Sequence, residues 1–233
     1  RDLRMSRGLG DVYKRQFLLL LLLPIHNSVA QEETFEPLFE NIDITKGLPH
    51  NTVQKIFQDS EGYMWFATKD GLCRYDGYNF IVYCESLVKE SISNSKVRCI
   101  AEDAHKNIWV GTWGAGLHLL HDAYNPEKTT WTTFTHDENR SGTISDNLIY
   151  AISEDLNTNS LWVGTRSGLS ILSLMDIKTG HLEFENCYSG ESENSITSSE
   201  VASLLRDRQG IMWVGMIGGG INMAVSYTHL TLP

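Results

Sequence analysis

The chain has 233 residues, enough for one sizeable hydrophobic core, and a formal net charge of −10. A chain this acidic lacks the basic surface expected of a nucleic-acid-binding protein, so we predict no nucleic-acid partner. Its Asp and Glu residues are dispersed rather than gathered in a tail, which is typical of a solvated surface.

The first recognisable segment is the apolar run FLLLLLLPI at 17–25. Its nine residues are too few to span a membrane, which takes about 20. Lys14 and Arg15 precede the run, and SVA at 28–30 follows it, with small residues three positions and one position before a cleavage site at Gln31. These features predict a signal peptide over 17–30 and an exported protein, the alternative being a buried core segment.

The two ends of the chain do not share the pattern of the rest. Residues 1–16, RDLRMSRGLGDVYKRQ, and residues 225–233, VSYTHLTLP, resemble translated adaptor sequence. We therefore expect both to be non-native tails, and residues 31–224 to be a fragment of a longer chain.

One sequence motif occurs four times between the two tails. Its tryptophans are 44, 53 and 51 residues apart and are Trp65, Trp109, Trp162 and Trp213. Six or seven residues before each stands an aspartate: Asp59, Asp103, Asp155 and Asp207. The stretches 48–59, 92–103, 144–155 and 196–207 also align without a gap. Such internal repetition predicts a repeat architecture.

Each copy reads as short strands separated by turns. A β-branched stretch such as VRCIAED (97–103) is followed by a turn, DSEG or DRQG, in which Asp comes first and Gly fourth. A strand such as IWVGT, a Gly-rich turn and a strand such as LHLLH follow. More polar strands are predicted at 79–83, 130–136 and 183–188, and no helical period appears past residue 35.

Four strands in each 44–53 residues are typical of the blade of a β-propeller. We predict an all-β fold within 31–224, with four consecutive four-stranded blades at about 48–83, 92–136, 144–188 and 196–224, the last without its outer strand. The tryptophans would pack between neighbouring blades, and Ala67, Gly111, Gly164 and Gly215 would allow the next sheet to approach. A β-sandwich is the alternative, but sandwiches do not repeat a phrase of this length.

Cysteine and histidine spacing predicts no metal site and no cofactor. Cys73, Cys84, Cys99 and Cys187 form no CxxC pair, and the histidines form no HxH or HExxH motif. Cys73 and Cys84 fall on neighbouring predicted strands, which leaves open whether they form a disulfide or remain buried thiols.

The unit V..I..D..G.mWvGT..GL resembles the two-component regulator propeller repeat. The opening FENIDITKGLPHNTVQKIFQDSEGYMWFATKDGLCRYDGYNF is similar to the usual start of such an array, and the resemblance covers about residues 35–223. The fourth copy departs from the pattern, because Met216 replaces the threonine and GGGI replaces the leucine after the turn.

The resemblance implies the sensor region of a hybrid two-component histidine kinase. Such proteins typically carry two seven-bladed propellers in the periplasm, an immunoglobulin-like module, one membrane helix and a cytoplasmic kinase; many sense oligosaccharides and regulate polysaccharide utilisation. This chain would supply the first four blades, on the periplasmic side of the bacterial inner membrane. It would bind an oligosaccharide, form a homodimer in the full-length protein, and contact the membrane only through a C-terminal helix that this sequence lacks. It carries no kinase motif, so we expect no enzyme activity of its own.

Candidate ligand-binding residues lie at one rim of the predicted propeller. The turns between second and third strands share this rim with the segments that precede each first strand, and together they carry Lys69, Asn94, Trp113, Asp146, Asn147 and Arg166. Trp113 stands in a turn and could stack on a sugar, whereas the Asn and Asp side chains could equally satisfy turn backbones. The four repeated tryptophans could also stack on sugars, but their constant place inside an apolar strand predicts core packing. The four repeated aspartates are predicted to form turns, because a catalytic pair would not recur in every blade.

Two other classes of function remain open. A secreted carbohydrate-active propeller enzyme, a glycosidase or lyase, should show paired carboxylates that break the repeat at one rim. Asp146 breaks it with an acid at its position but has no evident partner. A non-catalytic interaction propeller would bind no small ligand.

Overall fold

A computed structural model of the chain describes residues 37–84, 96–125, 128–178, 182–191 and 195–224. The predicted tails at 1–16 and 225–233 and the predicted signal peptide at 17–30 lie outside these ranges. The chain divides into two units, Arg1–Glu40 and Asn41–Pro233, and the fold described below belongs to the second. Among the described residues, no helix is long and apolar enough to cross a membrane.

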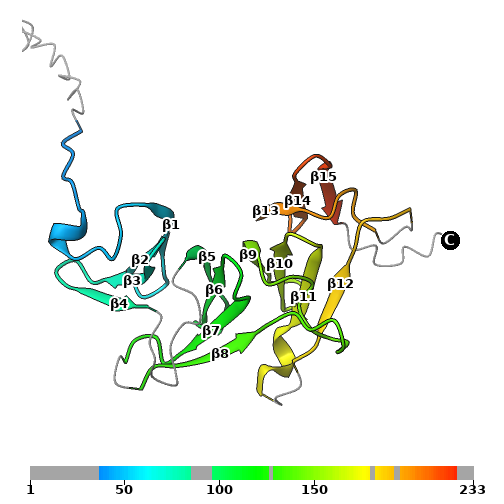
Figure 1. Cartoon of the computed structure of the whole chain (residues 1–233), viewed down its shortest axis with the longest axis horizontal. Helices are drawn as coiled ribbons and strands as arrows, with labels where there is room; N and C mark the ends of the chain where they lie inside the picture. Colours follow the sequence, from blue (N-terminus) through cyan, green and yellow to red (C-terminus); the bar gives the residue numbers. More distant parts are fainter. Residues whose placement is uncertain (1–36, 85–95, 126–127, 179–181, 192–194, 225–233) are drawn as a thin grey trace, which may run out of the picture. The chain divides into compact units, whose positions relative to one another are not determined.

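Fifteen strands form four antiparallel sheets within the described residues (Figure 1). The first sheet contains β1 (Val53–Gln58), β2 (Met64–Thr68), β3 (Gly71–Tyr75) and β4 (Phe80–Tyr83). The second contains β5 (Val97–Glu102), β6 (Ile108–Thr112), β7 (Leu117–His121) and β8 (Thr130–Phe134).

The third sheet contains β9 (Ile149–Asp155), β10 (Ser160–Thr165), β11 (Leu169–Ser173) and β12 (Phe184–Cys187). The fourth has three strands in the described residues, β13 (Val201–Arg206), β14 (Met212–Met216) and β15 (Gly220–Ala224). Two short 3₁₀ helices, η1 (Ile44–Lys46) and η2 (Leu174–Lys178), complete the described elements.

The sheets are consecutive blades of a β-propeller. Each is a meander in sequence order, and the first strands contact one another in the order β1, β5, β9, β13. Residues of all four first strands line one cavity of about 280 Å³, which marks the propeller axis. The predicted all-β propeller fold is confirmed, and the sandwich alternative is wrong.

Three of the four repeated tryptophans pack between neighbouring sheets. Trp65 lies in a cluster with Val97 and Val110 of the second sheet, and Trp109 lies in a cluster with Ile149 and Val163 of the third. Both indoles are fully buried. Trp162 is half-buried against the fourth sheet, and Trp213, on the far face of that sheet, is 37% exposed.

The repeated aspartate holds the tryptophan as well as the turn. Asp103 Oδ1 accepts hydrogen bonds from the backbone N–H groups of His105 and Asn107, at 2.9 Å each, while Oδ2 accepts from the Trp109 indole N–H at 2.9 Å. Asp59 and Asp207 bind Trp65 and Trp213 in the same way.

The third sheet shows why the spacing between aspartate and tryptophan matters. There the spacing is seven residues instead of six, and the Trp162 indole donates to Ser160 Oγ at 3.0 Å rather than to Asp155. The sequence predicted the aspartates as turn formers but not this second role, whose signal was the spacing of six residues in the first, second and fourth copies.

Neighbouring sheets are also joined by the residues that precede three of the repeated aspartates. Glu102 accepts hydrogen bonds from Ser60 N and Oγ, both at 2.7 Å, in the turn of the first sheet. Glu154 accepts from Ala104 N at 2.9 Å, in the turn of the second. At the same position in the fourth repeat, the positively charged Arg206 donates a hydrogen bond to Asp155 at 3.0 Å, in the turn of the third sheet. In the second, third and fourth repeats, this position therefore joins its sheet to the preceding one.

Replacing Gly164 by alanine is expected to lower the free energy of unfolding by about 1–3 kcal/mol, because it overpacks the joint between the third and fourth sheets. A Cβ at this position would lie 2.7 Å from both the carbonyl oxygen and Cγ1 of Val201. Gly190→Ala is the matched control, since its Cβ would meet nothing closer than 3.6 Å. Chemical denaturation of both variants tests this; equal stabilities would show that the sheets do not approach closely at Gly164.

Candidate functional site

The predicted rim exists, and backbone hydrogen bonds assemble it identically in every sheet. The turn between the second and third strands donates to the segment that precedes the first strand of the same sheet. The four bonds are Lys69 N to Thr52 O at 3.3 Å, Trp113 N to Lys96 O at 2.9 Å, Arg166 N to Leu148 O at 3.1 Å, and Ile217 N to Glu200 O at 2.9 Å. Side chains from distant parts of the sequence are thereby gathered along one edge of the propeller.

Small polar groups close these turns. In the first three sheets a threonine hydroxyl donates to the carbonyl of the glycine that ends the turn, as Thr112 Oγ1 does to Gly116 O at 2.9 Å. Gly116 has a φ of 86°, and a Cβ there would collide with Phe134 O, so glycine is required. In the fourth sheet, where Met216 replaces the threonine, Thr197 Oγ1 donates to Gly219 O instead, at 2.6 Å.

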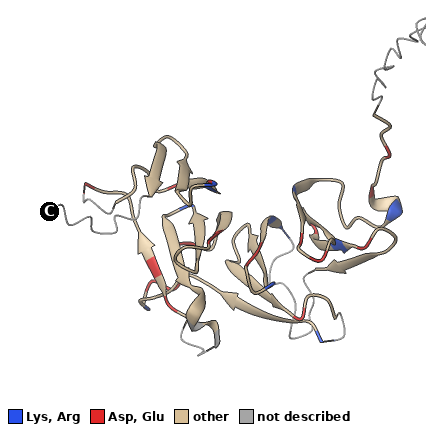
Figure 2. Cartoon of the chain, turned by 180° about the vertical axis from the view of Figure 1, so that it is seen from behind, with Lys and Arg blue, Asp and Glu red and all other residues tan. Residues whose placement is uncertain are grey.

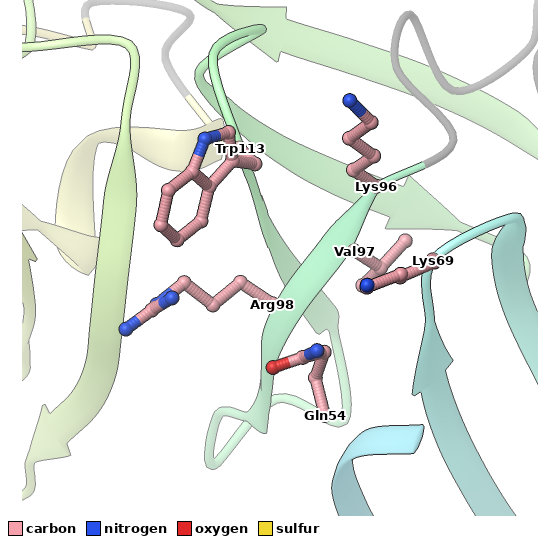
Figure 3. Close-up of a pocket in the computed structure, with 6 residues that line it drawn as sticks. All are labelled: Gln54, Lys69, Lys96, Val97, Arg98 and Trp113. Carbon is pink, nitrogen blue, oxygen red and sulfur yellow. The ribbon is translucent and has the colours of Figure 1, made fainter. Parts of the chain in front are cut away.

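A first pocket lies at this rim between the first and second sheets (Figure 3). It has a volume of about 420 Å³ and is lined by Gln54, Lys69, Lys96, Val97, Arg98 and Trp113. The Trp113 side chain lines this pocket and is 46% exposed to solvent. Two of the predicted ligand-binding residues, Lys69 and Trp113, therefore meet here.

Arg98 has an aromatic ring on each of two sides. Its guanidinium carbon lies 4.7 Å from the centroid of the Trp113 ring and 4.5 Å from that of Tyr150 on β9. Figure 3 shows the Arg98 side chain reaching past the Trp113 ring. Cation–π attraction of this kind contributes on the order of 1 kcal/mol per contact and holds the guanidinium in one orientation.

A second pocket of about 530 Å³ lies at the same rim, between the second and third sheets. Its lining includes three more predicted residues, Asp146, Asn147 and Arg166. The Arg166 Nε lies 3.2 Å from Asp146 Oδ2, which also accepts a hydrogen bond from Ser167 Oγ at 2.7 Å. Burial raises the pKa of Asp146, but the bonds from Ser167 and Leu148 N and the charge of Arg166 outweigh it and lower the pKa overall.

Asn147 serves the backbone. Its Oδ1 accepts from His136 N at 2.7 Å, and its carbonyl oxygen accepts from the N–H groups of Gly114 and Gly116 at 3.2 and 2.8 Å. These bonds tie the turn that carries Trp113 to the third sheet. In the second pocket, Asp146 pairs the charge of Arg166, and Asn147 is hydrogen-bonded to the backbone.

The structure divides the predicted ligand-binding residues between two pockets. Asn94 lies outside the described residues. Arg98 and Tyr150 were not predicted from the sequence. They occupy the same repeat position as Gln54 and Ala202, directly after the first aliphatic residue of the strand. The four repeats place four different residue types there, and this variability was the available signal.

Cysteines and histidines form no chemical centre in the described part of the chain. All four cysteines are free, and β-ladder pairing places Val82, not Cys84, opposite Cys73. Burial raises the pKa of the Cys73 and Cys99 thiols to about 12, so neither is a ready nucleophile. No group of three His, Cys, Asp or Glu side chains within the described ranges is arranged to hold a metal ion. Acidic residues are spread over the fold, and basic residues occur in short separate segments (Figure 2).

A family model for the two component regulator propeller matches residues 47–70, 91–114 and 195–218. These matches coincide with the first, second and fourth copies of the repeat. The third copy, which the model leaves unmatched, is the one with the longer spacing between Asp155 and Trp162. No curated protein matches the chain.

Solved structures extend the similarity to most of the chain. The extracellular domain of the proposed hybrid two component system BT3049 from B. thetaiotaomicron is 27% identical with a TM-score of 0.66, over 79% of this chain and 24% of that one. The corresponding domain of BT4673 is 21% identical with a TM-score of 0.60, over 78% of this chain and 22% of that one.

PorZ, a bacterial surface component of the type-IX secretion system of Porphyromonas gingivalis, shares the fold at 16% identity and a TM-score of 0.56, over 73% of this chain and 25% of that one. The chain spans about a quarter of the length of each of these structures. Three segments of the chain therefore match the two component regulator propeller repeat, and its sheets form consecutive blades of a β-propeller similar to the extracellular domain of BT3049.

Proposed function

We propose that the chain is the N-terminal part of the ligand-sensing propeller of a hybrid two-component sensor, that it is exported to the periplasmic side of the inner membrane, and that it detects an oligosaccharide. Similarity to the extracellular domain of BT3049 supports the sensor role. The observation that carries the binding role is the first rim pocket, where Trp113 is half exposed beside a cavity of about 420 Å³. Flat aromatic faces cover the apolar faces of sugar rings, and polar groups around them bind the hydroxyls.

The mechanism follows from the place of the pocket between two sheets. Lys69 belongs to the first sheet, whereas Trp113 and Arg98 belong to the second. A ligand that contacts both sheets binds best to one relative arrangement of the blades and shifts the population toward it. In a longer, dimeric sensor this shift would be passed to the cytoplasmic output domain, and the chain itself performs no catalysis.

Thermal unfolding of the full chain against a panel of neutral and charged oligosaccharides tests this proposal. A ligand at 100 times its Kd should stabilise the fold by about 2.7 kcal/mol and raise the midpoint by roughly 5–10 °C. Trp113→Ala should abolish the shift, and Trp213→Ala should retain it. The absence of any shift across the panel would refute oligosaccharide sensing, and release of reducing ends would identify an enzyme instead.

A further inference from the structure

The first rim pocket is cationic although the chain as a whole is acidic. The net charge is −10, yet the described residues that line the pocket include Lys69 and Arg98 and no acid. Asp70 follows Lys69 in the turn but is not part of the lining. Gathering like charges around a cavity costs free energy unless an anion enters it, so the pocket is suited to a negatively charged ligand.

Arg98 makes the pocket more than a collection of surface charges. Three other arginines of the fold donate hydrogen bonds through their side chains: Arg74 to Ala123 O, Arg166 to Asp146 and Arg206 to Asp155. The Arg98 guanidinium, in contrast, makes no hydrogen bond or ion pair within the described residues; its contacts are the rings of Trp113 and Tyr150.

A guanidinium held in this way is preorganised to bind a carboxylate or a sulfate. It carries five N–H donors in a planar fork that matches the two oxygens of a carboxylate or sulfate. Because the rings already restrict the side chain, less conformational entropy is lost when the fork closes on an anion. Lys69, from the neighbouring sheet, adds a second positive charge on another side of the cavity (Figure 3).

We propose that this pocket binds the carboxylate or sulfate group of an acidic oligosaccharide, with Arg98 as the principal anion contact, Lys69 as a second cation and Trp113 against a sugar ring. This inference rests on the proposed function and adds the charge class of the ligand. A neutral sugar would leave the fork unpaired, and the acidic surface elsewhere on the protein would repel a long polyanion such as a nucleic acid.

Calorimetric titration of the full chain with three sugars tests the charge requirement. The probes are trigalacturonate, its fully methyl-esterified and therefore neutral form, and 3′-sulfated lactose. We expect trigalacturonate or the sulfated sugar to bind, the stronger of the two identifying the anion, and we expect the affinity to fall as salt is added. The ester should not bind measurably. If the ester binds as tightly as the acid, or if neither charged sugar binds, the inference is wrong. If a neutral sugar binds under either of these outcomes, the proposed oligosaccharide sensing is still supported and only the charge requirement is wrong.

Three variants locate the bound anion. Arg98→Gln should weaken binding of the charged sugar by about 10-fold to 100-fold, the usual worth of a hydrogen-bonded charge. Lys69→Gln, at an exposed turn position that should not disturb folding, should weaken it by about 2-fold to 5-fold. Arg166→Gln is the matched control on the same rim, where Asp146 already pairs the arginine, and should leave the affinity unchanged. Unchanged affinity in both the Arg98 and Lys69 variants would place the anion elsewhere and overturn the proposal.

Discussion

Replacing Trp109 by alanine is expected to lower the free energy of unfolding by about 3–5 kcal/mol, the usual cost of removing a large buried aromatic side chain. The Trp109 indole is fully buried, lies 5.9 Å from the Phe134 ring between centroids, and packs in the cluster that joins the second and third sheets. Its removal would leave a cavity that β-sheet backbones on both sides cannot close. Urea denaturation followed by circular dichroism measures the loss.

Trp213→Ala is the matched control for this experiment. Trp213 occupies the same repeat position and makes the same indole hydrogen bond, to Asp207 at 2.9 Å, but no sheet in the described residues covers its outer face. Its replacement should cost only about 1–2 kcal/mol, from the hydrogen bond and partial burial. The difference between the two variants measures what packing between blades contributes. Equal losses would mean that the tryptophans stabilise their own sheets rather than the joints.

Acidification from pH 7 to pH 4 should destabilise the protein by up to about 3 kcal/mol through His118 alone. The His118 ring is fully buried on β7, with Nδ1 3.0 Å from Thr133 Oγ1, and burial lowers the pKa of its imidazole from 6.5 to about 4. Between these two values the unfolded chain takes up a proton that the folded protein excludes. The stability that depends on neutral His118 is therefore complete above pH 6.5 and is lost as the pH falls toward 4.

The comparison variant for His118 is His118→Gln, which has no titrating ring. As the pH falls, the native protein should lose stability that the variant keeps, because only the native protein must hold the His118 imidazole neutral when folded. The free energy of unfolding of the variant should therefore rise relative to that of the native protein. Asp146 and Asp155, whose pKa values are lowered, lose their contributions below this window, at or under the ordinary carboxylate pKa. A difference between the two proteins that does not change between pH 7 and pH 4.5 would contradict a neutral, buried imidazole.

The fold could be predicted from sequence because every blade must pack against its neighbour in the same way, so the same residue types recur at the same positions. Trp109 and Gly111 recur with Trp162 and Gly164 since each joint needs one large ring and one close approach. Strand positions followed from the same repetition. The repeat could not reveal the second role of Asp103, because a hydrogen bond to an indole six residues away depends on how the turn brings the two side chains together.

The candidate site could be predicted only in part, because ligand-facing positions are those at which the repeats differ. Lys69 and Trp113 could be predicted as rim residues because they lie in a turn whose sequence varies from copy to copy. Arg98 lies inside a strand whose pattern resembles that of its neighbours, and its role depends on Tyr150, about fifty residues away in a different sheet. Contacts across the joints between blades are set by tertiary packing, which no local pattern encodes.

A crystal structure of the full chain grown with the charged sugar that binds more tightly would locate the ligand. We expect a carboxylate or sulfate within hydrogen-bonding distance of the Arg98 guanidinium and a sugar ring against Trp113, between the first two sheets. A sugar bound instead beside Asp146 and Arg166, or on the outer face of the fourth sheet at Trp213, would contradict this proposal.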